Sequence, residues 1–378
     1  MRIARSWRLR ISIGLAAAAA AAVAACGVRP SGGAGPAPST SIHVGGVGIV
    51  PLGSGVFAAI RDEPLGLAVN ANSLFIINDS DVVVVDAQFT RQATLEALAA
   101  LRRLTPLPVS FVVNTDWHDD HVAGNQVYAD SFPGVRFLAQ ANTRTDLVEL
   151  GRPNRDAQVR FAPAAADRIE RMLALGLAPD SSKLVEGEGA SLSSAVRIVR
   201  QYVAEHAGFR EVLPDSLVDR ETTLVRGHRR IELRWFGRAN TRGDLVVFLP
   251  AERVVATGEL VGAPVPFAFR SYPTEWIAVL DSVDALGGRI FVPGHGPVLR
   301  GSSYLRRVRS ALAVARARTR AAAARGDSLP QVLRAVPLDD VRADFAGGDS
   351  WTAALFDRFF RVPVITRLYE DATRGPLH

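Results

Sequence analysis

The sequence predicts an α/β protein in which two β-sheets are covered by helices. Two blocks of short apolar runs lie before and after residues 146–213, and the stretch between them loses the strand pattern for helical spacing. A further helical stretch follows the last strand-like run. Of the 378 residues, 48% are hydrophobic, which is enough for a large buried core and excludes a disordered chain.

The N-terminus predicts export and a lipid anchor. Residues 1–10 contain four arginines, residues 11–25 are almost wholly apolar, and Cys26 follows at once. This apolar run is shorter than the about 20 residues that a membrane-spanning helix needs. Residues 23–27 resemble a bacterial lipobox, although a plain signal peptide is the alternative, and Cys26 is the only cysteine in the chain. We expect residues 1–26 to be a lipoprotein signal peptide that places the protein in the cell envelope or periplasm.

The segment after Cys26 predicts a flexible tether. The charge balance of the mature chain is a separate observation that argues against a polyanionic partner. Residues 27–41 are rich in Gly, Pro and Ser. The net charge of +6 falls to +2 when the four arginines of the signal are removed, leaving 40 Lys and Arg against 38 Asp and Glu. We therefore expect contact with a membrane through the lipid, and no nucleic-acid partner. The sequence makes no prediction of the oligomeric state.

The first strand-rich block contains a recognisable hairpin. Residues 73–77 and 82–85 are apolar runs joined by the polar turn 78–81, which predicts two paired strands. Leucines at helical spacing then predict a helix over 94–104, and residues 109–113 form the next predicted strand.

The rest of the chain continues the pattern after a helical insertion over about 146–213. The second block predicts strands at 224–225, 231–236, 245–249, 254–257 and 290–292, with a helix over 274–286. Residues 301–378 predict a helical C-terminal extension whose first helix is basic. A solvated outer helix is favoured there over a helix that contacts lipid headgroups.

The chemistry concentrates directly after the strand that ends at Val113. Four side chains with metal-binding atoms follow within six residues: Asp116, His118, Asp120 and His121. A solvated polar loop is the alternative, but the preceding apolar strand and the Gly-Asn exit at 124–125 favour a metal-binding loop.

This segment resembles the His-x-His-x-Asp-His signature of the metallo-β-lactamase superfamily, with Asp116 in place of the first histidine. Later landmarks of the family follow in order over residues 56–298: 237–244 is similar to the Gly-x-x-His-Thr-x-Gly-Asp loop, 256–260 to the Thr-Gly-Asp strand end, and 293–297 to the Gly-His-Gly turn. The resemblance implies an αββα sandwich, which we place at residues 42–300.

The resemblance also implies two groups of metal ligands. The first metal site reads Asp116, His118 and Asn240, the bridging position reads Glu259, and the second site reads Asp120, His121 and His295. Two of the three first-site histidines are replaced, whereas the second site is complete. We expect one firmly held divalent ion, zinc first, with manganese or iron as alternatives. Asp116 is either a ligand or an acceptor that orients a histidine, and loop hydrogen bonding is favoured for Asn240.

A divalent ion lowers the pKa of a bound water molecule and polarises a carbonyl or phosphoryl oxygen, so the expected reaction is hydrolysis. The resemblance implies that Asp120 both ligates the ion and orients the attacking water. The expected substrate is a small extracytoplasmic molecule such as a β-lactam, a lactone or another ester or amide. The alternative is a non-catalytic lipoprotein of this fold that binds a ligand or partner through a degenerate site.

Overall fold

A computed structural model describes residues 42–62, 69–178, 181, 183–184 and 187–375. The predicted signal peptide, Cys26 and the tether lie outside these residues. None of the described helices combines the length and the apolar character that crossing a membrane requires.

The first sheet has eight strands in sequence order, and it changes from antiparallel to parallel halfway across. β1 to β5 form an antiparallel meander, and β5 to β8 pair in parallel. The hairpin predicted from the apolar runs is β4 and β5. The strands are β1 Ile42–Val44, β2 Val47–Gly53, β3 Val56–Arg61, β4 Ser73–Ile77, β5 Val82–Val85, β6 Val109–Val113, β7 Arg136–Gln140 and β8 Ser216–Val218.

The second sheet has six strands in the order β14-β13-β12-β11-β10-β9. Only β12 and β13 pair in parallel, so their carboxyl ends lie side by side at one edge. The strands are β9 Glu221–Arg226, β10 Arg229–Trp235, β11 Leu245–Leu249, β12 Val254–Gly262, β13 Ile290–His295 and β14 Leu299–Arg300.

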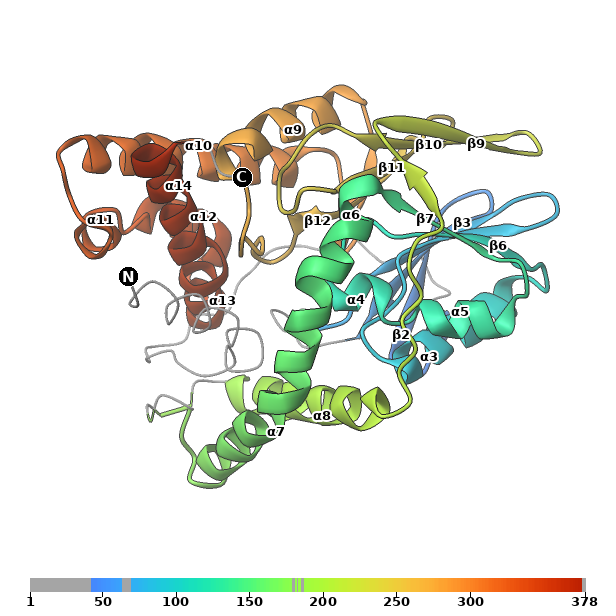
Figure 1. Ribbon diagram of the computed structural model, residues 1–378, viewed down its shortest axis with the longest axis horizontal. Helices are drawn as coiled ribbons and strands as arrows, with labels where there is room; N and C mark the ends of the chain where they lie inside the picture. Colours follow the sequence, from blue (N-terminus) through green and yellow to red (C-terminus); the bar gives the residue numbers. More distant parts are fainter. Residues whose placement is uncertain (1–41, 63–68, 179–180, 182, 185–186, 376–378) are drawn as a thin grey trace.

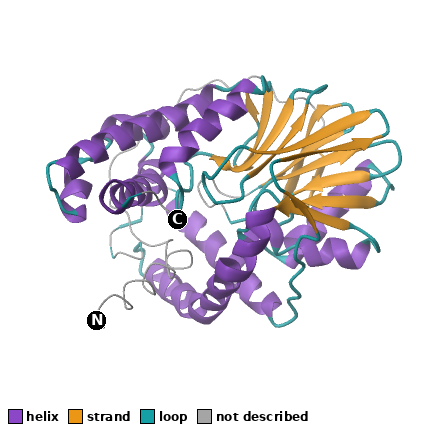
Figure 2. Cartoon of the chain, turned by 45° about the horizontal axis from the view of Figure 1, so that its top comes forward, coloured by secondary structure: helices purple, strands orange, loops and turns teal. Residues whose placement is uncertain are grey.

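The two sheets pack face to face with helices outside each of them, which confirms the predicted αββα layers (Figures 1 and 2). Apolar side chains of both sheets, such as Ile76 and Val83 from one and Leu233 and Val247 from the other, form one buried cluster between them. A second cluster joins the first sheet to α3 (Arg91–Leu104) and α5 (Asn125–Ser131). A third joins the other sheet to α9 (Pro273–Ala285) and the C-terminal helices.

Helix α3 shows how the sequence specifies its outer layer. The side chain of Thr90 caps the helix by accepting a hydrogen bond of 3.1 Å from the backbone N–H of Ala93. Ala97, Leu98 and Leu101 repeat at helical spacing and are buried against the first sheet. The opposite face carries arginines and stays in solvent.

The chain between β7 and β8 of the first sheet folds as helices that belong to neither sheet. Its elements are α6 Ala141–Asp146, η1 Leu147–Gly151, α7 Arg152–Ala174 and α8 Glu188–His206. Helices α7 and α8 pack on each other through a small apolar cluster of their own that includes Ile169 and Leu192. The described strands resume only at β8. The helical insertion predicted over about 146–213 thus lies beside the sandwich. Its limits as a separate unit stay a prediction.

The C-terminal region is helical, as expected, and it gathers at the end of the molecule away from most of the strands (Figure 1). Its elements are α10 Ser303–Ala324, α11 Leu329–Ala335, α12 Asp339–Ala346, α13 Ser350–Leu355, η2 Phe356–Arg361 and α14 Val362–Arg374. Leu305, Val308 and Leu312 lie on the buried face of α10, so this basic helix packs on the protein through its apolar stripe.

Candidate metal centre and adjoining pocket

Four side chains with metal-binding atoms meet where the two sheets present the ends of their strands. Asp120 and His121 lie on the short helix α4 (Asp119–Val122), which follows β6. Glu259 belongs to β12, and His295 ends β13. These four residues, here called the donor cluster, each offer one ligand atom, and all four atoms lie within 4.8 Å of one another.

The contacts within the donor cluster run between imidazole and carboxylate. Nε2 of His295 lies 2.9 Å from Oδ2 of Asp120 and 2.8 Å from Oε1 of Glu259. Nε2 of His121 lies 3.4 Å and 3.3 Å from the same two oxygens. Ligand atoms about 2.1 Å from a tetrahedral zinc ion are separated by about 3.4 Å, so this arrangement fits a single small divalent cation.

Both histidines are oriented by a partner on the far side of the ring. Nδ1 of His121 lies 2.9 Å from Oδ2 of Asp86, and Nδ1 of His295 lies 3.1 Å from the backbone oxygen of Asn70. Such partners fix the imidazole so that Nε2 faces the ligand position. Asp86 is itself held by the backbone N–H and the hydroxyl of Thr115, at 2.8 and 2.7 Å.

Sequence reasoning missed Asp86. The available signal was an acidic residue directly after the apolar strand β5. Its φ of 58° is a left-handed conformation that an aspartate adopts at a cost, which is a feature of functional sites. Burial raises the pKa of the Asp86 carboxyl, although the neighbouring His121 opposes that rise.

Without a cation the donor cluster balances its own charges with protons. Burial lowers the pKa of His295, but the carboxylates of Glu259 and Asp120 outweigh burial and raise it to about 10. Burial raises the pKa of Glu259, but His295 and His121 outweigh burial and bring it well below its usual range. A divalent cation would replace these protons, so its binding is coupled to proton release.

Two glycines allow the strand ends to approach. A Cβ on Gly258, whose φ is +51°, would lie 2.4 Å from the hydroxyl oxygen of Thr115. A Cβ on Gly294 would lie 2.7 Å from Oε1 of Glu259. Both contacts are shorter than side chains tolerate, so glycine at each position keeps Glu259 and the Thr115–Asp86 contact in place.

The three residues predicted for the first metal site are not among the four of the donor cluster and have partners of their own. Asp116 is fully buried, accepts a hydrogen bond of 2.8 Å from the backbone N–H of His118, and contacts Nδ1 of that ring at 3.1 Å. Burial lowers the pKa of His118, but Asp116 outweighs burial and raises it to about 9. The amide nitrogen of Asn240 donates to the backbone oxygen of Phe267. These contacts agree with an orienting role for Asp116 and with loop hydrogen bonding for Asn240.

The helical insertion contacts the metal-binding loop through Asp119, a residue that the sequence analysis did not single out. Nη2 of Arg155, on α7, lies 2.6 Å from Oδ1 of Asp119, and the hydroxyl of Tyr202, on α8, donates to Oδ2 at 2.6 Å. Arg155 also contacts Oε1 of Glu211 at 3.0 Å. Only 4% of the Asp119 and Arg155 side chains is exposed, so this is a buried ion pair next to Asp120.

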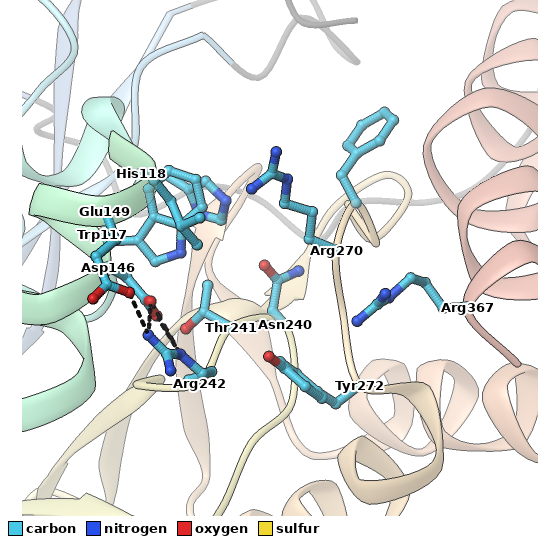
Figure 3. Close-up of a pocket in the computed structure, with 12 residues that line it drawn as sticks. Trp117, His118, Asp146, Glu149, Asn240, Thr241, Arg242, Arg270, Tyr272 and Arg367 are labelled. Carbon is cyan, nitrogen blue, oxygen red and sulfur yellow. Dashed lines mark hydrogen bonds and ion pairs between the residues drawn. The ribbon is translucent and has the colours of Figure 1, made fainter. Parts of the chain in front are cut away.

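A pocket of about 500 Å³ opens beside the metal-binding loop (Figure 3). None of the four donor-cluster residues lines it; Asn240, which does, donates to the backbone oxygen of Phe267, whose ring centroid lies 5.6 Å from that of His295. The pocket is lined by Trp117, His118, Asp146, Glu149, Leu150, Asn240, Thr241, Arg242, Phe269, Arg270, Tyr272 and Arg367. It thus combines apolar walls with three guanidinium groups, and it is large enough for a small organic molecule.

Comparison with known proteins identifies relatives with this arrangement of layers. Residues 66–295 match the family model of the metallo-beta-lactamase superfamily. A linear primary-alkylsulfatase from a Pseudomonas strain is 24% identical over 253 residues, which cover 61% of this chain and 43% of the alkylsulfatase. The chain therefore spans less than half the length of that relative.

Solved structures agree with the fold. The stereoselective inverting sec-alkylsulfatase from Pseudomonas sp. superimposes with a TM-score of 0.59 at 16% identity, over 86% of this chain and 50% of the other. A metallo-beta-lactamase from Pontibacter korlensis superimposes with a TM-score of 0.50 at 17% identity, over 71% of this chain and 99% of the other. Because the family match covers more than half of the residues and includes strands of both sheets, this chain belongs to the metallo-beta-lactamase superfamily.

Proposed function

We propose that this protein is a metal-dependent hydrolase of a small substrate met outside the cytoplasm. The single observation that supports this most strongly is the donor cluster, in which two oriented imidazoles and two carboxylates converge beside an open pocket. Hydrolysis is the chemistry of the superfamily relatives named above. Candidate substrates are β-lactams, lactones and other small esters or amides, and the alkylsulfatase relative adds sulfate esters.

Each residue of the donor cluster has a proposed role that follows from its position. Asp120, His121 and His295 would hold the ion, with Glu259 as the fourth donor. When bound, zinc, manganese or iron would act as a Lewis acid toward the substrate and toward water. Asp120 keeps 18% of its side chain exposed, against 5% or less for the other three, so its carboxylate can meet an incoming water molecule and accept its proton.

A non-catalytic ligand-binding lipoprotein remains the second candidate. The observation that favours it is that Asp116 pairs with His118 and that Asn240 donates to Phe267, so these first-site residues contact one another and the backbone. A protein that only binds a ligand needs the pocket but does not need a catalytic metal centre.

The test is metal content followed by turnover. We expect about one divalent ion per chain in protein purified without chelators and offered zinc, manganese or iron, together with hydrolysis of at least one member of a panel of lactams, lactones, phosphoesters and sulfate esters. His295→Ala should abolish most metal binding, because it removes a donor that contacts both carboxylates. Asn240→Ala is the matched control and should leave metal content nearly unchanged. A wild-type protein without metal would overturn the catalytic proposal, and one that binds metal but hydrolyses nothing would favour the second candidate.

We also propose that the protein is exported and anchored through Cys26, on the strength of the lipobox-like segment. In that location the protein would meet only substrates that are present in the cell envelope or outside the cell.

A further inference from the structure

The helical insertion supplies one wall of the pocket. Leu150 lines the cavity and belongs to η1, a π-helix that follows α6. Short π-helical turns are frequent at functional sites. A Cβ on Gly151, the last residue of η1, would lie 3.7 Å from Cε3 of Trp117, so the backbone of η1 lies against this indole. Trp117, Leu147 and Leu150 also pack together in one apolar cluster.

Three side chains of α6 fix this wall to the loop before β11. The amide nitrogen of Asn142 donates to the backbone oxygen of Arg242 at 3.3 Å, and the hydroxyl of Thr143 donates to that of Gly243 at 3.0 Å. Asp146 accepts a hydrogen bond of 3.0 Å from Nε of Arg242 (Figure 3). The wall is therefore held on two sides, by the loop and by the indole.

Two of the arginines that line the pocket already have partners within the protein. Arg242 is paired with Asp146. Nη1 of Arg367 lies 2.9 Å from Oε2 of Glu370, and its Nε donates to the backbone oxygen of Ser271 at 2.9 Å. A charged ligand would compete with these charge-assisted contacts, whereas an apolar group would leave them intact.

Trp117, Leu150 and Phe269 give the lining an apolar surface. Leu150 and Phe269 are only half-buried, so contact with an organic group would remove more of their surface from water. The ring centroid of Trp117 lies 4.4 Å from that of His118. An organic group that contacts Trp117 and Leu150 would therefore lie beside the metal-binding loop.

We propose that Leu150, together with Trp117, selects the size of an apolar group of the substrate, so that the pocket takes molecules with an alkyl or aryl group against η1. This inference rests on the proposed function and names the part of the substrate that the pocket recognises. Leu150 is the residue to change, because Trp117 is buried in the metal-binding loop.

The experiment compares chain-length preference at unchanged metal content. The substrates are 4-nitrophenyl acetate, butyrate and hexanoate, which vary the acyl group, and methyl, butyl and hexyl acetate, which vary the alcohol. In at least one series, Leu150→Ala should raise the ratio of kcat/KM for the longest to the shortest ester about tenfold, and Leu150→Trp should lower it by a similar factor, as expected for a methylene-scale change in a pocket.

The same changes at Leu175 are the matched control. This leucine belongs to the same insertion and is 70% exposed, so Leu175→Ala and Leu175→Trp should leave both ratios unchanged. Wild-type ratios in both Leu150 variants, or equal shifts in the Leu175 variants, would overturn the inference. Melting temperatures check the fold, and Leu150→Phe takes the place of Leu150→Trp if the latter does not fold.

A binding measurement separates this inference from the proposed function. The methyl and hexyl ethers of 4-nitrophenol have no ester to hydrolyse, and binding is followed by quenching of tryptophan fluorescence. Leu150→Trp should weaken binding of the hexyl ether about tenfold and change that of the methyl ether little. Binding that depends on Leu150, without hydrolysis of any ester, would support the wall and count against the hydrolase. Hydrolysis whose chain-length preference ignores Leu150 would support the hydrolase and refute the wall, and absence of both would overturn both.

Discussion

Replacing Arg155 with methionine tests whether the helical insertion stabilises the metal-binding loop. Methionine keeps much of the volume and removes the charge. The change leaves Asp119 buried with only the hydroxyl of Tyr202, 2.6 Å away, and leaves Glu211 with only Arg152. Because 4% of the Asp119 side chain is exposed, water cannot replace the lost guanidinium.

The expected loss follows from the kind of contact. Breaking a buried ion pair on one side costs about 3–5 kcal/mol of unfolding free energy, because an uncompensated charge stays in the interior. Tyr202→Phe removes one hydrogen bond to a charged group and should cost about 1.5–3 kcal/mol. Arg309→Met, which breaks an exposed pair with Asp281, is the matched control and should cost about 0–1 kcal/mol.

Urea unfolding of metal-free protein gives these free energies, and competition with a chromogenic chelator gives the metal affinity. Arg155→Met should weaken metal binding as well, because Asp119 lies between His118 and Asp120 on the loop that carries two donors. The double variant Asp119→Leu with Arg155→Met should recover part of the lost stability, since neither charge is then left alone. A loss below about 1 kcal/mol in Arg155→Met, similar to that of the Arg309 control, would refute this account of the buried network.

Two further predictions concern pH and location. Burial, helped by the charge of Asp116, raises the pKa of Asp244 to about 7, so the folded protein keeps this proton up to about pH 7 while the unfolded chain releases it near pH 4. The stability that the proton contributes is complete below pH 4 and disappears as pH rises through 7. In urea unfolding of metal-free protein, the unfolding free energy of Asp244→Asn minus that of wild type should therefore be more favourable at pH 8 than at pH 5. A difference that does not vary with pH would contradict this. Cys26→Ser should move the protein from the membrane fraction to the soluble fraction, and continued membrane partition would place the anchor elsewhere.

The parts of the fold that sequence could predict are those specified by local pattern. The hairpin of β4 and β5 follows from two apolar runs around a polar turn, and α3 follows from leucines at helical spacing. The helix begins at Arg91, three residues before the predicted start, because Thr90 caps it. The two layers of sheet follow the two strand-rich blocks except at β8, which comes after the helical insertion and yet pairs with β7 of the first sheet. By contrast β7, with only five residues, has a sequence that does not stand out from its surroundings.

The donor cluster was predictable because ordered motifs carry it, whereas its supports were not. Asp120, His121, Glu259 and His295 each sit in a recognisable segment. Arg155 and Tyr202 lie 36 and 83 residues from Asp119, and no local pattern relates them. The same holds for Arg367, which reaches the pocket only through the packing of α14 against α9 and the loop before it.

The residues that depart from the family's ligand pattern, Asp116 and Asn240, depend less on a bound cation than the residues of the donor cluster do. Burial opposes ionisation of Asp116, but His121 and His118 outweigh burial and lower the pKa of its carboxyl, so this buried charge is already compensated. The amide of Asn240 is satisfied by a backbone oxygen. In the donor cluster, two imidazoles whose Nδ1 atoms are already engaged face two carboxylates, and only protons or a cation can hold them together. Asp116 and His118 thus pair with each other, although neither Oδ2 of Asp116 nor Nδ1 of His118 makes a hydrogen bond. The donor cluster instead brings four ligand atoms to one point, which is why we expect one ion and a retuned site more than a decayed one.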